Sequence, residues 1–188
     1  MMDSPRSESL DRALLAVIDM QPGFLKVIPG GDAVARRCAF AISAASLVGI
    51  PVAFTEQVPA KLGPTDPALA ALAPGAAIFG KETFSAFNDA AFPAALAKRA
   101  TTHLLLAGIE TPVCVFQTAL GALSLGLQVT ILSDCVGARR ADDAADVLRY
   151  LAAKGCHILP SEAVYYSVLC GATHPSFREY TALVKQFG

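Results

Sequence analysis

The sequence predicts a three-layer α/β/α protein built on a six-stranded, mainly parallel sheet. Two observations predict this fold class. Short apolar runs alternate along the chain with longer stretches in which apolar residues recur at helical spacing. Strands that alternate with helices favour a parallel sheet with helices on both faces, joined by right-handed crossovers. Because the 188 residues contain no repeat or long linker, we expect residues 1–12 to be a disordered lead and residues 13–188 to be a single domain.

Each predicted strand is an apolar run that stops at a polar residue, a glycine or a proline. The strands cover residues 13–18, 50–54, 76–79, 103–107, 128–132 and 156–159. The first is apolar throughout, which is typical of a strand buried on both faces. Helices are expected at residues 32–48, 68–73, 89–99, 141–154 and 175–186, with one between Thr111 and Gly126 and another capped by Ser161. Residues 55–67, 82–88 and 134–140 are expected to be polar loops or turns.

The composition restricts the class of partner. Hydrophobic residues make up 54% of the chain and charged residues only 16%, with a net charge of −1 and no basic block. Nucleic acid and anionic membranes are therefore poor partners, and a homodimer or higher homo-oligomer is expected to cover part of the apolar surface. Five widely spaced cysteines without a C-x-x-C pair, and the lack of a signal-peptide core or a long apolar run, indicate reduced thiols and a cytoplasmic location.

The stretch from Gly108 to Cys114 carries the strongest chemical signal. It follows a predicted strand, and Thr111 and Pro112 suit the N-cap and the first position of a helix. Cys114 would then lie in the first helical turn, where the partial positive charge of the helix N-terminus favours the thiolate. Its amide N–H would have no partner within the helix and would be able to bind an anion. A nucleophile and an oxyanion donor would thus share one residue.

Asp19 and Lys81 each follow a predicted strand, as Cys114 does. The carboxyl ends of parallel strands meet at one edge of a sheet, so these three side chains are expected to converge. Asp19 can accept the thiol proton, and Lys81 can hold the carboxylate and stabilise developing negative charge. Taken singly, Asp19 is as well explained as a turn cap, Lys81 as a solvated turn residue and Cys114 as a packing residue. Only their joint placement favours a catalytic site.

Several pieces of the chain, in order, resemble the isochorismatase-like cysteine hydrolases. The pieces are Val17-Ile18-Asp19-Met20-Gln21 with Phe24, Gly80-Lys81 with Phe84-Ser85, and Gly108-Ile109-Glu110-Thr111 through Cys114-Val115. The resemblance covers almost the whole chain and is closest to the small isochorismatase-domain proteins of unassigned substrate. It implies a Rossmann-like strand order of 3-2-1-4-5-6.

The resemblance also implies the roles of individual residues. Asp19, Lys81 and Cys114 would form the catalytic triad, and a cis peptide bond would join Ile109 to Glu110. The N–H groups of Glu110 and Cys114 would form the oxyanion hole. The substrate pocket is expected to contain Phe24, Glu56, Phe84, Val113 and Tyr165.

One departure from the family pattern bears on the reaction. Nicotinamidases of this family carry an Asp-x-His metal site after the second strand, where this chain has Thr55-Glu56-Gln57. We therefore expect no metal and no cofactor. The sequence predicts a metal-independent cysteine hydrolase that acts on a small amide or related C–N bond through a thioester. The alternatives are isochorismatase-type hydrolysis of a vinyl ether, with Asp19 as the general acid, and a non-catalytic oligomeric member of the family.

Overall fold

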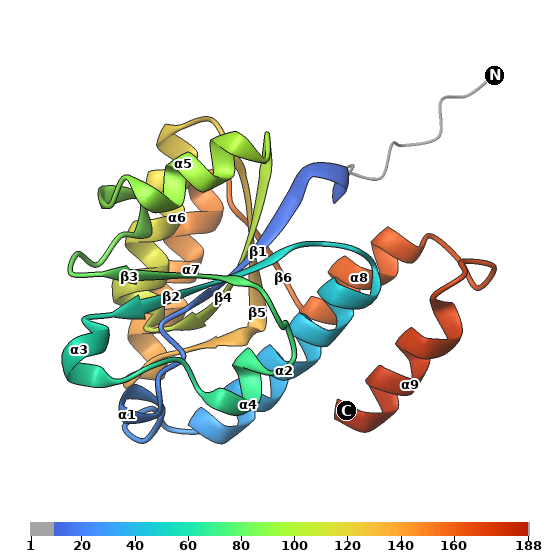
Figure 1. The fold of residues 1–188 in the computed structure, drawn as a ribbon, viewed down its shortest axis with the longest axis horizontal. Helices are drawn as coiled ribbons and strands as arrows, with labels where there is room; N and C mark the ends of the chain where they lie inside the picture. The colour runs from blue at the N-terminus through green and yellow to red at the C-terminus, as the bar shows by residue number, and fades with distance from the viewer. Residues whose placement is uncertain (1–9, 188) are drawn as a thin grey trace.

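The computed structural model describes residues 10–187 of the chain. Its centre is a parallel six-stranded sheet with the order β3-β2-β1-β4-β5-β6 (Figure 1). The strands are β1 (Ala13–Ile18), β2 (Val52–Gln57), β3 (Ala77–Lys81), β4 (His103–Ile109), β5 (Gln128–Gly137) and β6 (His157–Leu159). The fold class and the strand order expected from the sequence are confirmed.

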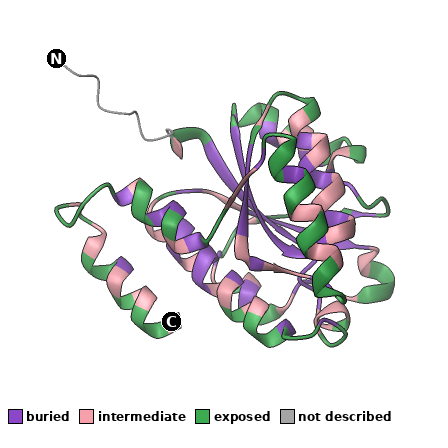
Figure 2. Ribbon diagram, turned by 180° about the vertical axis from the view of Figure 1, so that it is seen from behind, coloured by how far each residue is buried: buried purple, intermediate pink, exposed green. Residues whose placement is uncertain are grey.

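Two apolar clusters fill the two faces of the sheet, and β1 divides its side chains between them. Leu15 and Val17 belong to one cluster, and Leu14, Ala16 and Ile18 belong to the other. This division follows from the alternation of side chains along a strand. It explains why every residue of β1 is buried and apolar. Figure 2 shows the buried strands at the centre and the exposed outer faces of the helices.

Helices pack on both faces of the sheet (Figure 1). Those that contribute to the first cluster are α2 (Gly31–Leu47), α8 (Ser161–Leu169) and α9 (Phe177–Phe187). Those of the second cluster are α5 (Ala91–Lys98), α6 (Phe116–Ser124) and α7 (Ala141–Ala153). Helix α9 lies outside α2, against which it packs. In the part of the chain that the structure describes, no helix is both long and apolar enough to cross a membrane.

Short helical turns make up much of the rest. They are η1 (Leu10–Arg12), α1 (Pro22–Leu25), α3 (Pro59–Leu62), α4 (Pro67–Ala70), η2 (Ala86–Asn88) and η3 (Thr111–Val115). The prediction that the disordered lead extends to residue 12 is wrong, because η1 is ordered. Leu10 packs against the first cluster, and the Arg12 carbonyl accepts a hydrogen bond from the Thr102 N–H at 3.0 Å. Residues 1–9 of that prediction lie outside the described residues.

Four strands, β2 to β5, continue past their predicted ends, and the extensions of β2 and β5 are the longest. In β2, Thr55, Glu56 and Gln57 pair with β3 instead of forming the start of a loop. In β5, Val136 and Gly137 pair with the end of β4 after a shift of register, so most of the predicted turn at residues 134–140 is strand. Strand pairing satisfies the backbone hydrogen bonds of these polar residues, and this tertiary effect outweighs their weak intrinsic preference for strands.

Candidate active site

Three strand ends bring Asp19, Lys81 and Cys114 together. The Lys81 ammonium lies between the other two: its Nζ is 2.7 Å from Asp19 Oδ2 and 3.6 Å from Cys114 Sγ. All three residues are buried, with exposed fractions of 1%, 3% and 6% for Asp19, Lys81 and Cys114. Lys81 is the buried last residue of β3, so the alternative interpretation of Lys81 as a solvated turn residue does not apply.

The position of Asp19 depends on the close approach of β1 and β4. Its backbone has a positive φ of 50° and its N–H donates to the Thr55 carbonyl at 3.1 Å, while the Thr55 hydroxyl donates to Asp19 Oδ1 at 2.7 Å. Across the sheet, Gly108 has a φ of 109°, and a Cβ at this position would lie 2.1 Å from the Ile18 carbonyl oxygen. Only glycine fits such a contact.

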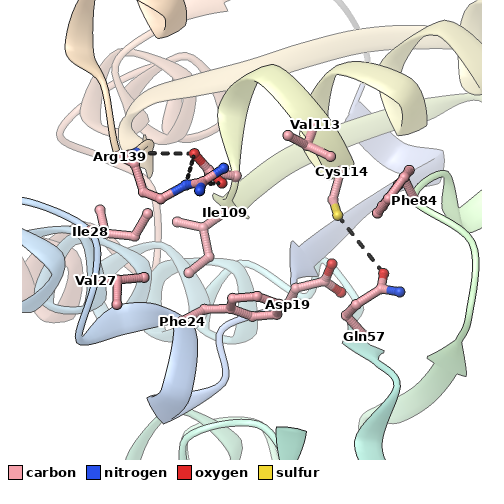
Figure 3. A pocket seen from close by; sticks show the side chains of 11 residues that line it. Asp19, Phe24, Val27, Ile28, Gln57, Phe84, Ile109, Val113, Cys114 and Arg139 are labelled. Atoms are coloured by element: carbon pink, nitrogen blue, oxygen red, sulfur yellow. Dashed lines mark hydrogen bonds and ion pairs between the residues drawn. The ribbon is translucent and has the colours of Figure 1, made fainter.

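Gln57 is a further member of the site, which the sequence analysis did not identify. Its Oε1 accepts a hydrogen bond from Lys81 Nζ at 2.6 Å and lies 4.0 Å from Cys114 Sγ (Figure 3). Its Nε2 donates to the Glu82 carbonyl at 3.2 Å, which fixes which end of the amide faces the lysine. The Gln21 side chain holds the Gln57 N–H at 2.8 Å. The alternation of side chains along a strand could have identified Gln57. If β2 continues as a strand past Phe54, Thr55 and Gln57 lie on the same face of the sheet.

The same alternation removes Glu56 from the site. Its Oε1 accepts hydrogen bonds from the N–H of Thr65 at 2.7 Å and from the Thr65 hydroxyl at 2.9 Å, so it holds the loop that follows α3. Tyr165 is also remote from the cavity, because it is fully buried in the first cluster and its hydroxyl donates to the Ala41 carbonyl at 2.8 Å. The prediction that these two residues line the pocket is wrong.

Cys114 lies within the π-helical turn η3, directly before α6. Thr111 is not the N-cap that the sequence suggested, since its hydroxyl donates to the Gly137 carbonyl at 3.0 Å and Glu110 occupies the cap position. Burial, and to a lesser extent the neighbouring Asp19 carboxylate, raise the pKa of the Cys114 thiol to about 12, while Lys81 acts in the opposite direction. Burial thus opposes the preference for the thiolate that a helix N-terminus gives, because it disfavours the charged form of the sulfur.

Glu110 joins the end of β4 to the segment that follows β5. The peptide bond between Ile109 and Glu110 is cis. The Glu110 carboxylate accepts hydrogen bonds from the Arg139 N–H at 3.1 Å and from Arg139 Nε at 3.1 and 3.0 Å. Arg139 is not among the predicted site residues, because the sequence around it is typical of a polar turn and does not indicate its partner.

A cavity of about 410 Å³ opens above the sulfur (Figure 3). It is lined by Asp19, Phe24, Val27, Ile28, Gln57, Phe84, Ile109, Glu110, Val113, Cys114 and Arg139. Of the five residues expected to form the pocket, Phe24, Phe84 and Val113 line it. The cavity places apolar walls around a polar floor that holds an acid, a thiol and a carboxamide.

The residues at the position of the family's metal site are engaged in other contacts. Thr55 binds Asp19, Glu56 binds Thr65 and Gln57 binds Lys81. Across residues 10–187, no three His, Cys, Asp or Glu side chains are grouped so that they could hold a metal ion. The donor set of the metal-dependent relatives is therefore not reproduced at this position.

Comparison with known proteins gives one consistent family. The isochorismatase domain model matches residues 12–163. The isochorismatase domain-containing protein 2 of Bos taurus is 34% identical over 174 residues, which cover 93% of this chain and 83% of that protein. The isochorismatase domain-containing protein 1 of Danio rerio is 34% identical over 145 residues, which cover 77% of this chain and 50% of that protein.

Solved structures show the same fold. The MAR1 ribonuclease from Caenorhabditis elegans is 31% identical with a TM-score of 0.86, and the match covers 93% of this chain and 90% of that one. The YcaC protein of Escherichia coli, described as an octameric hydrolase of unknown specificity, is 19% identical with a TM-score of 0.85 and coverage of 99% and 98%. At that identity it shows the fold alone. By the family model and the relatives at 31% to 34% identity, the chain belongs to the isochorismatase family.

Proposed function

We propose that this protein is a metal-independent cysteine hydrolase that cleaves a small amide or a related C–N bond through a thioester. One observation carries the proposal. Asp19 and Cys114 both lie within 3.6 Å of Lys81 Nζ, at the floor of a cavity large enough for a small molecule. An acid, a cation and a thiol in one buried site are the groups that covalent acyl transfer requires.

In the first half of the reaction, Cys114 forms the acyl-enzyme. Because the pKa of its thiol is raised to about 12, the sulfur is protonated at rest and must lose its proton as it attacks. Asp19 takes that proton, the sulfur bonds to the carbonyl carbon, and the carbonyl π electrons move onto its oxygen. When the tetrahedral intermediate collapses, the C–N bond breaks, Asp19 returns the proton to nitrogen, and ammonia or an amine leaves.

In the second half, water replaces the amine. Asp19 accepts a proton from the attacking water as the water oxygen bonds to the carbonyl carbon of the thioester. When the C–S bond then breaks, Asp19 returns this proton to the sulfur and the carboxylic acid leaves. Lys81 offsets the charge of Asp19 throughout, and Gln57 holds Lys81 in place through the 2.6 Å hydrogen bond. The N–H groups of Glu110 and Cys114 are assigned to the developing oxyanion. The contacts between Arg139 and the Glu110 carboxylate support this assignment, because they restrain the residue that carries one of these N–H groups.

The test is release of ammonia from a panel of small amides. The wild-type protein should hydrolyse at least one of them, and Cys114→Ala and Asp19→Asn should each reduce turnover by about a thousandfold or more. Cys170→Ala is the matched control, since Cys170 is an exposed cysteine beyond the end of α8. Full turnover by Cys114→Ala on an amide that the wild-type protein hydrolyses would refute the thioester.

The raised pKa of Cys114 favours a second candidate, the hydrolysis of a vinyl ether. In this reaction Asp19 protonates the substrate as a general acid, and an uncharged thiol takes no part in bond formation. The same two variants, Cys114→Ala and Asp19→Asn, distinguish the two candidate functions. A vinyl-ether hydrolase retains turnover in Cys114→Ala and loses it in Asp19→Asn, whereas an amidase loses it in both.

Cleavage of RNA, suggested by the name of the C. elegans relative, has less support in this cavity. A phosphodiester needs cations that are available to its charge. Arg139 lines the cavity and Lys81 contacts its floor, and each is paired with a carboxylate: Lys81 with Asp19 and Arg139 with Glu110. An RNA substrate belongs in the same screen as a negative control.

We further propose that the protein self-associates. The low content of charged residues supports this, as does Ile78, which is 52% exposed on the edge strand β3. The E. coli YcaC protein of the same fold is described as octameric. Light scattering coupled to gel filtration should give a mass of at least twice 19.5 kDa, and a monomer at micromolar concentration would refute the proposal.

A further inference from the structure

We propose that the substrate is an uncharged amide whose remaining part is apolar, aromatic or branched. This inference rests on the proposed function, because it places the reacting carbonyl beside Cys114. It adds the chemical class of the group that fills the rest of the cavity. Three features of the structure carry it: the distribution of polar atoms, the pairing of charges and the apolar mouth.

The polar groups of the cavity lining are gathered in two places: the groups assigned to the reaction form the floor, and Arg139, paired with Glu110, lies apart from them (Figure 3). Asp19, Gln57 and Cys114 form the floor, while Phe24, Ile28 and Val113 are among the apolar side chains that form the walls (Figure 3). An amide bound at the floor would direct its substituent along these walls. A cavity of about 150 Å³ holds a benzene molecule, so the 410 Å³ of this cavity has room for an aromatic ring beside the amide.

The charges around the cavity cancel in pairs. The Asp19 carboxylate is 2.7 Å from Lys81 Nζ, and the Glu110 carboxylate is 3.0 Å from Arg139 Nε. A carboxylate or ammonium on the substrate would therefore enter an apolar space in which the nearest opposite charges are already paired. Burial of an uncompensated charge is costly, so charged analogues should bind much more weakly.

The mouth of the cavity exposes apolar side chains that are held in place. Phe84 is 52% exposed and Val27 is 58% exposed, although both line the cavity. The segment that carries Phe84 is anchored on both sides: the Thr83 carbonyl accepts from Lys81 Nζ at 3.3 Å, and the Ala86 N–H donates to the Thr118 hydroxyl at 3.1 Å. A fixed and exposed aromatic ring beside a cavity is typical of a surface that an apolar ligand covers.

The test measures binding by calorimetry to the full chain carrying Cys114→Ala, which removes the nucleophile. The probes are 4-methylphenylacetamide and two charged analogues of similar size, in which the methyl group is replaced by a carboxylate or by an aminomethyl group. The neutral amide should bind at least about tenfold more tightly than either analogue. Adding Phe84→Ala should weaken its binding about five- to tenfold. Adding Leu125→Ala, which removes a side chain that is 62% exposed and is not among the cavity residues, should change it less than twofold.

Equal or tighter binding of the carboxylate would overturn the inference and would show that Arg139 leaves Glu110 to bind anions. Failure of the neutral amide to bind, or an unchanged affinity in the Phe84→Ala protein, would also overturn it. A failure of the proposed function has a different signature. In that case the neutral amide binds as expected, but the wild-type protein releases no ammonia from it.

Discussion

Replacing Lys81 with methionine keeps most of the side-chain volume but removes the ammonium from the centre of the site. In the wild-type protein this group donates to Asp19 Oδ2 at 2.7 Å and to Gln57 Oε1 at 2.6 Å. The Lys81 and Asp19 side chains are 2% and 1% exposed. In the variant, the Asp19 carboxylate keeps the hydroxyl of Thr55 at 2.7 Å but loses its countercharge, and only 1% of its side chain is exposed.

The loss of one partner from a buried ion pair costs about 3–5 kcal/mol. A domain of this kind has a total free energy of unfolding of about 5–15 kcal/mol, so Lys81→Met should destabilise it severely. At roughly 2–4 °C per kcal/mol for a chain of this size, the Tm should fall by about 6–20 °C. Because the cost comes from the stranded carboxylate, Asp19→Asn in the Lys81→Met background should restore about 2 kcal/mol or more. Neither variant should retain activity.

Urea unfolding of the wild-type protein, the two single variants and the double variant completes a double-mutant cycle. Lys98→Met is the control, since Lys98 is an exposed lysine in the last turn of α5, and its loss should change the free energy of unfolding by less than about 0.5 kcal/mol. The reasoning is refuted if Lys81→Met lies within about 1 kcal/mol of the wild type. It is also refuted if Asp19→Asn gives no recovery in the Lys81→Met background.

Three further predictions follow from the site. Because the pKa of the Cys114 thiol is raised to about 12, its alkylation by iodoacetamide, followed by mass spectrometry, should rise about tenfold per pH unit from pH 7 to 10 without a plateau. Gly108→Ala should destabilise the protein by about 3 kcal/mol or more in thermal unfolding, since the added Cβ would lie 2.1 Å from a backbone oxygen. Gly75→Ala is the control: this glycine also has a positive φ but has open space around it, so the substitution should cost about 1 kcal/mol. Gln57→Leu should lower turnover about a hundredfold, whereas Glu56→Gln, on the other face of the same strand, should leave turnover within about twofold and lower stability by about 1 kcal/mol.

Each of these predictions has an outcome that contradicts it. A plateau in the alkylation rate near pH 8 would show that Cys114 is a thiolate in the resting protein. Equal losses of stability in Gly108→Ala and Gly75→Ala would mean that the backbone relaxes around the added methyl group. Equal effects of Gln57→Leu and Glu56→Gln on turnover would place both side chains, or neither, in the catalytic site.

The sequence was most informative about features that depend on neighbouring residues alone, such as the apolar runs that form strands. Continuous apolar runs predicted the strands, because a strand buried on both faces has no polar positions. The ends of those runs then placed Asp19, Lys81 and the segment that carries Cys114 at the same edge of the sheet. The family resemblance added the strand order and the cis bond between Ile109 and Glu110, both of which the structure contains.

Local rules failed where pairing with a neighbouring strand decided the outcome. Residues 55–57 are polar and precede a proline-rich segment, so their sequence favours a loop, yet β3 pairs with them and extends β2. That extension turns Gln57 toward Lys81 and Glu56 toward Thr65, the reverse of the predicted pocket. The lengthening of β5 likewise brings the segment that carries Arg139 against Glu110, a contact between residues 29 positions apart.

The sequence by itself determined the fold class, the parallel sheet and the edge at which Asp19, Lys81 and Cys114 meet, because apolar periodicity and strand ends are local properties of the chain. Only the tertiary structure decided which polar side chains complete the site, since a strand's length fixes the face on which each residue lies. It also decided the surroundings of the sulfur. A cysteine at the start of a helix favours a thiolate, but burial and the neighbouring Asp19 carboxylate raise the pKa of Cys114 to about 12, because burial disfavours the charged form.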